Sequence, residues 1–479
     1  MLRNAVLIAS AVALLGGCAK LPLFQKPAAE LPAAWKDVPA QGQAVTGDRW
    51  WTVYNDAVLN RLVEEGLSQN RDLQIAAARI EEARALLRIT DAERAPSVDV
   101  TASRDRTRSS GRSSMPLPPG TPLERNTNRA TLNVAYELDL WGRLAGASKA
   151  ARADLLATEA ARRTVRIALE NQIVQSYYAL LALDGQVIVT QRTIEIRTRD
   201  VGLQRKRYEA GLISDFSLRQ LVSEVAVARA RLPALQQRRT AEEVALVTLL
   251  GRTPRAIVDE PMTFAADSAG LAAPVVPEGL PSDLLLRRPD IMEAEQRLAA
   301  ANARIGVARA SLFPRISLTG FLGSESGSLG DLFSAPARIW QLAFGLAQPI
   351  FQGGRLTAEV DAVRAREQQA LAQYQKTLQT AFGEVREALS AQTRTREAYA
   401  AETERTAALV ETLRLARIRF ENGLSSQLEV LDAERNLLQA ELERIDALRA
   451  QRAAVADLVR TLGGGWQNEE VMEKSDEKV

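Results

Sequence analysis

The sequence predicts a mainly α-helical protein that also carries four β-strands, and three observations support this fold class. Two long segments, Trp141–Arg207 and Gly353–Arg419, contain no proline and are rich in alanine and in charges of both signs. Four short stretches instead show the apolar and polar alternation of strands. The second half of the chain repeats the first, which indicates a duplication.

Composition excludes several classes of function. The 479-residue chain has 61 basic and 59 acidic residues, a net charge of +2, which argues against nucleic acid as a partner. It contains no histidine and a single cysteine. The usual general base, the usual zinc ligands and any intramolecular disulfide are therefore missing. We predict no metal site, no cofactor and no enzymatic activity.

The start of the chain resembles an export signal. A positive charge precedes Ala5–Leu15, an apolar run that is too short to span a bilayer as a helix. The residues that follow resemble the lipobox of bacterial lipoproteins, Leu15-Gly16-Gly17-Cys18. We expect residues 1–17 to be a signal peptide and Cys18 to become the lipidated N-terminus. An ordinary signal peptide with a chance cysteine is the alternative.

The remaining chain is predicted to form an arm, two repeats, a linker and a tail. The arm is rich in proline and alanine without periodicity, and helical periodicity begins near Asp56. The predicted boundaries are residues 18–55 for the lipidated arm, 56–251 for the first repeat, 252–282 for the linker, 283–463 for the second repeat and 464–479 for the polar tail.

Two glycine-containing segments show the duplication most clearly. One recurs as the other, namely Tyr208-Glu209-Ala210-Gly211-Leu212-Ile213-Ser214 and Phe420-Glu421-Asn422-Gly423-Leu424-Ser425-Ser426. The offset of 212 positions from Gly211 to Gly423 also relates Arg143 to Arg355. Each repeat is therefore predicted to contain a helix, a strand hairpin, a long helix, a tight turn near 208–214 or 420–426, and a returning helix.

Strand hairpins are predicted at about 97–140 and 315–351. Alternation is strict in Arg129–Leu140, where one face carries Leu132, Val134, Tyr136, Leu138 and Leu140. It is less clean in Ile339–Phe351, where one face carries Trp340, Leu342, Phe344 and Leu346. The first strands are weaker candidates, Ser97–Ser103 and Arg315–Gly323, and the loops are expected at 104–128 and 324–338. Small half-buried sheets that cap the helices would explain the alternation equally well.

Geometry limits what such a chain can build. In a membrane, four strands cannot close into a barrel, and open edges leave backbone groups unpaired at several kcal/mol each. One chain must then supply a third or a half of a shared barrel. The long helices would reach about 100 Å at 1.5 Å per residue, and coiled-coil packing would stabilise them. A lipid anchor, spanning strands and such helices together describe a duct across the periplasm.

Several motifs, in this order and spacing, resemble those of the TolC-like outer-membrane factors, also called outer membrane efflux proteins. They are Trp50-Trp51, Asn70-Arg71-Asp72-Leu73, Leu140-Trp141-Gly142-Arg143, Arg288-Pro289-Asp290-Ile291 and Phe351-Gln352-Gly353-Gly354-Arg355. The resemblance covers nearly all of the mature chain. Within the family, the chain resembles the lipoprotein branch that serves multidrug and metal efflux pumps. It implies a homotrimer with a twelve-stranded barrel, a twelve-helix periplasmic tunnel, and a closed end that opens when an adaptor docks.

The resemblance also implies an adaptor-binding tip at the two turns. The matching residues are Ala210, Gly211, Leu212 and Ser214 in the first turn, and Asn422, Gly423, Leu424 and Ser426 in the second. The glycines also suit a left-handed turn between antiparallel helices. A role in the turn alone is the simpler interpretation.

A gate is implied nearby. Glu429 and Asp432 lie where the family places acidic residues that face the tunnel, and they share one helical face. Three copies would place six carboxylates around a narrow pore, although such a pair taken alone is more often a solvated face. Phe420 lies where related proteins carry a gate tyrosine, and it cannot make that hydrogen bond. The first repeat has Ser217 and Gln220 at the equivalent positions.

We therefore expect a passive, gated exit duct for drugs, toxic compounds or metal ions in the outer membrane of a Gram-negative bacterium. Its expected partners are two further copies of the chain, a periplasmic adaptor, an inner-membrane transporter that supplies the energy, and outer-membrane lipid. The alternatives are the duct of a type I protein secretion system and a periplasmic adaptor or coiled-coil tether. A periplasmic hydrolase has little support, and the sequence does not name the exported compound.

Overall fold

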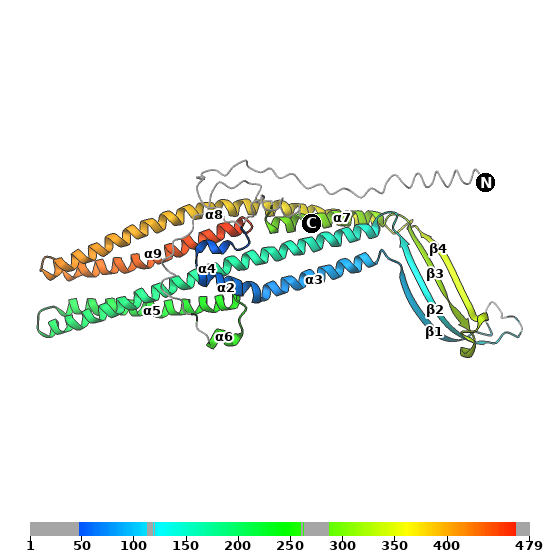
Figure 1. Ribbon diagram of the computed structural model, residues 1–479, viewed down its shortest axis with the longest axis horizontal. Coiled ribbons are helices and arrows are strands. Elements are labelled where there is room, and N and C mark those ends of the chain that lie inside the picture. Colours follow the sequence, from blue (N-terminus) through cyan, green and yellow to red (C-terminus); the bar gives the residue numbers. More distant parts are fainter. Residues whose placement is uncertain (1–46, 113–117, 119, 260–261, 263–286, 466–479) are drawn as a thin grey trace, which may run out of the picture. The chain divides into compact units, whose positions relative to one another are not determined.

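The computed structural model describes residues 47–112, 118, 120–259, 262 and 287–465, and their contacts divide the chain into two units. Within the described residues, unit 1 contains 79–159 and 293–375, and unit 2 contains the rest. Figure 1 shows the elements of both. Cys18, the signal peptide, most of the arm, most of the linker and nearly all of the tail lie outside the described residues.

Unit 1 contains one antiparallel sheet. Its strands follow the sequence order, β1 (Ser97–Arg108), β2 (Glu124–Leu138), β3 (Arg315–Ser326) and β4 (Arg338–Ala347). The pairing of β2 with β3 joins the two hairpins, which come from different halves of the chain. β1 and β4 form the two edges, and neither has a second partner within the described part of the chain.

The first hairpin is longer than its alternation indicated. Residues 104–108 and 124–128 belong to β1 and β2, whereas the sequence suggested a loop there. These residues are polar on both faces, so they give no hydrophobic period, although ladder bonds and the Arg106–Glu124 ion pair hold them together. β4 ends at Ala347, before Pro349, which cannot donate to a ladder.

The register places apolar side chains of all four strands on one face. Directly opposed residues share a face, so one row across the sheet consists of Val100, Leu132, Leu322 and Trp340. All four are exposed, Trp340 by 76%. The other face is mainly polar, and there Thr101 and Thr131 hydrogen bond to each other at 2.9 Å. An exposed apolar face with a bonded polar face is the pattern of a membrane barrel wall.

Long helices make up most of the chain. They are α2 (Ala57–Gln69), α3 (Arg71–Ala92), α4 (Arg143–Glu209), α5 (Asp215–Leu249), α7 (Pro289–Ala310), α8 (Arg355–Glu421) and α9 (Gln427–Thr461). The short elements are η1 (Trp50–Tyr54), η4 (Leu329–Asp331), η5 (Ala335–Ala337), and α6 (Pro254–Asp259), which lies within the predicted linker. α4 and α8 have 67 residues each, and α5 and α9 have 35 each.

One 18-residue window of α4 is apolar enough to cross a membrane by length and composition. Of that window, 56% is buried inside the protein. Buried core helices meet the same criterion, and the burial here fits that interpretation.

Unit 2 is held together by a core in which aromatic side chains also hydrogen bond. Asp56 caps α2 by accepting from the amides of Val58 and Leu59 at 2.9 and 3.1 Å, and it accepts from the Tyr177 hydroxyl at 2.8 Å. The Tyr54 hydroxyl donates to the Arg452 carbonyl at 2.7 Å. These bonds attach the start of the described chain to α4 and α9.

Glu170 is an unusual member of this core. It is 2% exposed, and it accepts from Trp50 Nε1 at 2.8 Å and from Arg166 Nε at 2.9 Å. Burial raises the pKa of its carboxyl group above the ordinary value of 4.5, although both hydrogen bonds oppose the shift.

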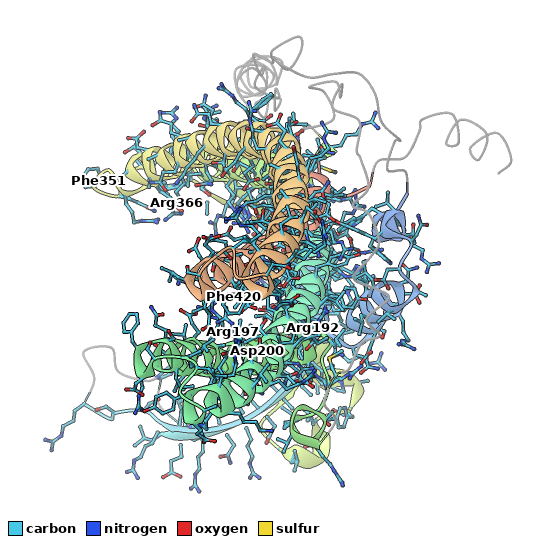
Figure 2. All side chains as sticks on the ribbon, turned by 90° about the vertical axis from the view of Figure 1, so that its left-hand side faces the viewer. Arg192, Arg197, Asp200, Phe351, Arg366 and Phe420 are labelled. Carbon is cyan, nitrogen blue, oxygen red and sulfur yellow. The ribbon has the colours of Figure 1, made fainter. Side chains whose placement is uncertain are left out.

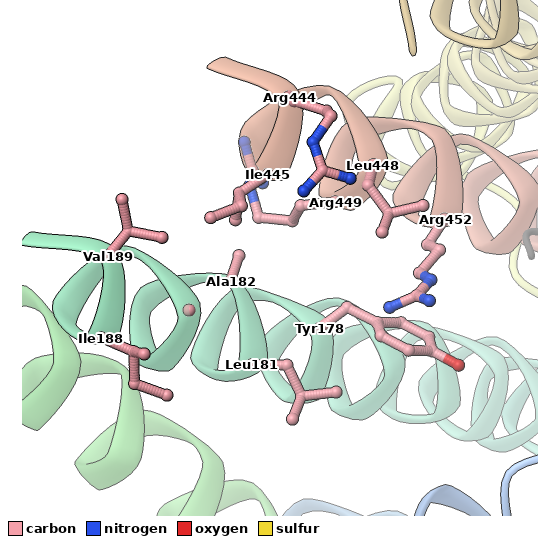
Figure 3. A pocket seen from close by; sticks show the side chains of 11 residues that line it. Tyr178, Leu181, Ala182, Ile188, Val189, Arg444, Ile445, Leu448, Arg449 and Arg452 are labelled. Carbon is pink, nitrogen blue, oxygen red and sulfur yellow. The ribbon is translucent and has the colours of Figure 1, made fainter. Parts of the chain in front are cut away.

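A pocket of about 250 Å³ lies between α4 and α9 in unit 2 (Figure 3). Its α4 side includes Tyr178 and Ala182, and its α9 side includes Ile445 and Arg452. The Arg452 guanidinium lies 4.7 Å from the centre of the Tyr178 ring. Burial lowers the pKa of Arg452 and raises that of the Tyr178 hydroxyl.

Candidate functional site

Both predicted tip turns are helix ends of the same type. In the first, the Leu212 amide donates to the Arg207 carbonyl at 2.8 Å and the Gly211 amide to the Tyr208 carbonyl at 2.8 Å. This pair of bonds defines a Schellman motif, which requires a left-handed residue, and Gly211 has φ 72°. Ser214 then caps α5 by accepting from the Ser217 amide at 3.2 Å.

The second turn repeats this geometry. The amides of Leu424 and Gly423 donate to the carbonyls of Arg419 and Phe420 at 2.8 and 3.0 Å, and Gly423 has φ 70°. Asn422 adds a bond from its side-chain amide to the Ile418 carbonyl at 2.7 Å. Ser426 differs from Ser214, because its side chain accepts no capping bond.

Space around both turns is open. A Cβ atom at Gly211 or Gly423 would have no atom within 4 Å beyond its chain neighbours, so glycine is needed there for its backbone angle and not for close packing. Leu212 and Leu424 are 68% and 70% exposed. Two apolar side chains on open turns form a surface that a partner could cover.

The two predicted gate carboxylates lie on the surface of α9, in its first two turns. Glu429 Oε2 is 3.8 Å from Arg419 Nε, and Asp432 accepts from the Asn436 side-chain amide at 3.1 Å. Both carboxylates are exposed in the single chain. Arg419 lies on the other arm of the same hairpin, so part of the Glu429 charge is compensated, which the sequence did not indicate.

Phe420 is half-buried at the end of α8. It takes part in the turn through its carbonyl, which accepts from Gly423. Its ring offers no hydrogen bond, as expected from the residue type.

The structure also contains a charged network that the sequence analysis missed. Arg197 of α4 is 4% exposed and donates to Glu224 of α5, to its carbonyl at 3.2 Å and its carboxylate at 3.1 Å. Its Nε lies 3.9 Å from Glu434 of α9. Figure 2 views the hairpin turns end-on and labels Arg197 and Phe420. We call this set, with Arg417 and Arg435, the inter-hairpin network.

The two further arginines complete the network. Arg417 of α8 donates to Glu434 at 2.7 Å, and Arg435 of α9 lies 3.6 Å from Glu224. The five side chains therefore join the α4–α5 hairpin to the α8–α9 hairpin. A buried arginine without its carboxylates would cost several kcal/mol, so this contact is specific to one arrangement of the hairpins.

The repeat contained a signal for this network. At the offset of 212 positions, Arg197 corresponds to Leu409 and Glu434 corresponds to Val222. A charged residue in one copy and an apolar residue at the equivalent position of the other indicate that the two positions have different contacts. Comparing the two copies in this way would have placed Arg197 and Glu434 among the candidates.

With this geometry in place, comparison with known proteins decides the family. The family model described as "Outer membrane efflux protein" matches residues 62–252 and 280–464. The chain belongs to the outer membrane efflux protein family. The membership confirms the resemblance noted in the sequence.

Similar proteins cover almost the whole chain. The probable efflux pump outer membrane protein TtgC of Pseudomonas putida is 36% identical over 474 residues, 97% of this chain and 96% of the relative. The cation efflux system protein CusC of Escherichia coli is 34% identical over 458 residues, 95% and 97% of the two chains. The Campylobacter jejuni CmeC outer membrane channel is similar in structure, with a TM-score of 0.89 at 25% identity over 96% and 98% of the two chains.

These comparisons also confirm the predicted fold class and the predicted function as an outer-membrane channel component of an efflux pump. Among the residues that the structure describes, no group of three or more acidic residues could hold a metal ion. The candidate site comprises the two turns, the exposed carboxylates Glu429 and Asp432, and the inter-hairpin network.

Proposed function

We propose that three copies of this chain form a passive exit duct for small molecules, with one shared twelve-stranded barrel in the outer membrane. The observation that carries this proposal is the four-stranded sheet of unit 1, with its exposed apolar face and its two unpaired edges. In lipid each edge must find a partner, because water is not available to its backbone groups. Pairing β4 of one copy with β1 of the next satisfies both edges, and twelve strands leave room for a channel.

The tunnel end of this duct is the pair of hairpins in unit 2. The two open turns would take the helical hairpins of a periplasmic adaptor, which links the duct to an inner-membrane transporter. Glu429 and Asp432 of three chains would line the narrow end and attract cations. The inter-hairpin network would hold the hairpins in one arrangement, and Cys18 would carry the lipid anchor.

The relatives support small molecules as cargo. Their names specify toluene, antibiotic and cation efflux. The chain itself would catalyse no covalent step, since the energy for transport comes from its inner-membrane partner. The alternative is the duct of a type I protein secretion system, and export of a protein by the purified pump would favour it.

Single-channel recording with a mass measurement on the same detergent-purified sample tests the proposal. We expect a trimer that conducts in small, cation-selective steps that divalent cations block. Glu429→Ala combined with Asp432→Ala should weaken the block, whereas Asp215→Asn, an exposed carboxylate in the first hairpin, should not. A monomer or dimer without conductance would contradict the shared barrel, and unchanged block in the double variant would remove the two carboxylates from the constriction.

A further inference from the structure

The large apolar side chains of this face end at one level on all four strands. Beyond the row that contains Trp340, the next row on the same face is Ala102, Ala130, Ser324 and Arg338. The opposite end of every strand is joined to a helix, so this boundary row of small and polar residues lies at the end of the sheet away from the helices. If the helices lie in the periplasm, that end of the sheet lies in the outer leaflet of the outer membrane.

Past this boundary, β1 carries three arginines at alternate positions, Arg104, Arg106 and Arg108. We call them the arginine ladder. Their spacing of two residues, about 7 Å along a strand, places them on the same face as Val98 and Val100. All three residues are exposed, and the side chains of Arg106 and Arg108 are 74% and 72% accessible.

The ladder has more positive charge than its neighbours neutralise. Arg106 and Arg108 share one carboxylate, that of Glu124, at 2.6 and 3.3 Å. Arg104 stands opposite Asn128, which has no charge. The outward face at this level therefore carries an excess of positive charge.

The opposite face of the same strands differs. There Arg129 pairs with Glu325 at 3.7 Å and lies 4.6 Å from the centre of the Phe321 ring, and Asp105 adds a negative charge. Positive charge on that face is compensated within the sheet. The unbalanced charge is thus limited to the face that continues the apolar band.

We propose that the arginine ladder binds the phosphate groups of the phosphorylated glycolipid that fills the outer leaflet of the outer membrane. Guanidinium groups bind phosphate in a bidentate fork, and long arginine stems can cover apolar surface while their charged ends reach the headgroup level. Arginine on the lipid face costs little near the interface and more at the midplane, which fits its place beyond the boundary row. The proposal rests on insertion of the sheet in the outer membrane and goes beyond the exit-duct function, which needs no specific lipid.

The test measures how much bisphosphorylated lipid A the purified full-length protein keeps through detergent exchange, by native mass spectrometry. Arg104→Gln with Arg106→Gln should lower retention about tenfold, the loss expected for charge-assisted bonds. This variant leaves Arg108 as the partner of Glu124. The matched control is Arg125→Gln, which lies on the opposite face of β2 beside the same part of β1. It should retain lipid as the unmodified protein does.

Equal retention by the double variant, an equal loss in Arg125→Gln, or equal retention of dephosphorylated lipid A would overturn the proposal. Displacement of the lipid by millimolar inorganic phosphate, but not by chloride of the same ionic strength, would show that free phosphate is the ligand and would overturn the lipid as its source. Arg104→Lys with Arg106→Lys keeps the charge and should retain more lipid than the glutamine variant. Single-channel conductance of the double variant should be unchanged, which separates failure of this proposal from failure of the duct.

Discussion

The two helical hairpins of unit 2 have the same backbone and different charges. Their helices have equal lengths, and their turns have glycines at φ 72° and 70° with matching hydrogen bonds. Yet Arg197 on the first hairpin corresponds to Leu409 on the second, and Ser217 corresponds to Glu429. The duplication therefore kept the geometry of a tunnel wall while each hairpin acquired its own side chains. The second hairpin carries the two predicted gate carboxylates, and the first supplies the buried arginine of the inter-hairpin network.

We expect the largest effect on stability and conductance from a substitution in the inter-hairpin network that gives the first hairpin the residue of the second. Arg197→Leu introduces the residue of the second copy and leaves the Glu224 and Glu434 carboxylates without their buried partner. We expect a loss of about 3 kcal/mol in the contact between the hairpins, and a larger single-channel conductance because they separate more easily. Thermal unfolding and bilayer recording measure the two effects.

Arg199→Leu is the matched control for this change. Arg199 lies two residues away on α4, and its ion pair with Glu195 is exposed. Exposed pairs contribute about 0 to 1 kcal/mol, so this variant should behave almost as the unmodified protein. If both variants raise conductance equally, the inter-hairpin network does not hold the hairpins together.

Substitutions of the turn glycines test whether the two turns, which have the same geometry, contribute equally to adaptor binding. Gly211→Val and Gly423→Val should each cost about 1 to 2 kcal/mol, because a branched residue is strained at positive φ while space around the turn is open. Asparagine tolerates this conformation, so Gly211→Asn and Gly423→Asn should cost less. Adaptor affinity, measured by surface plasmon resonance for each variant, reports on each turn. A valine that weakens binding at one turn alone would show that the adaptor uses the turns differently.

A charge substitution in the first hairpin tests whether both hairpins line the gate. Ser217→Glu with Gln220→Asp gives the first hairpin the carboxylates of the second. If both hairpins face the pore, cation selectivity in reversal-potential measurements should rise about twofold, since twice as many carboxylates line it. The same two acidic residues placed at Ser223 and Gln237, exposed positions further along α5, serve as the control. No change in selectivity in the first variant would place only the second hairpin at the constriction.

We expect the smallest effect, a change in the pH dependence of stability, at a buried position where the two long helices carry different residues. Glu170 of α4 corresponds to Phe382 of α8, and burial raises the pKa of the Glu170 carboxyl in the folded state. The folded protein therefore binds this proton more tightly than the unfolded chain does. Its contribution to stability is fully present below the unfolded value near 4.5 and is lost as pH rises through the folded pKa.

Glu170→Gln removes this titration while an amide oxygen can still accept from Trp50. We expect thermal stability to become less dependent on pH across that window, with the gain relative to the unmodified protein appearing at neutral pH. Thermal melts at several pH values measure it. A variant whose stability falls at every pH by the same amount would show that the carboxylate acts only as a hydrogen-bond acceptor.

Much of the fold could be predicted because it is periodic. The spacing of apolar residues alone predicts the long helices and the strands around Leu132 and Trp340. The constant offset from Gly211 to Gly423 predicts that the two turns are equivalent. The ends of β1 and β2 could not be predicted, since residues 104–108 are polar on both faces. α5 continues through Pro233, a residue that removes a helical hydrogen bond and whose cost neighbouring helices must offset.

The candidate site was predictable to a lesser extent. The turn glycines carry a strong local signal, because few residues adopt positive φ. The partners of Glu429 and the contacts of Arg197 depend on helices that are far apart in the sequence, so no local pattern reveals them. The difference between the copies at Arg197 and Leu409 was the available signal.

The open edges of the sheet also constrain how the protein is made. A lone chain would present the backbone of β1 and β4, beside an exposed apolar face, to any other strand it meets. Such a chain is stable neither in water, where it would aggregate, nor in lipid, where its edges stay unpaired. In the proposed trimer, assembly and insertion would be coupled, because each edge strand finds its partner only on another copy of the chain.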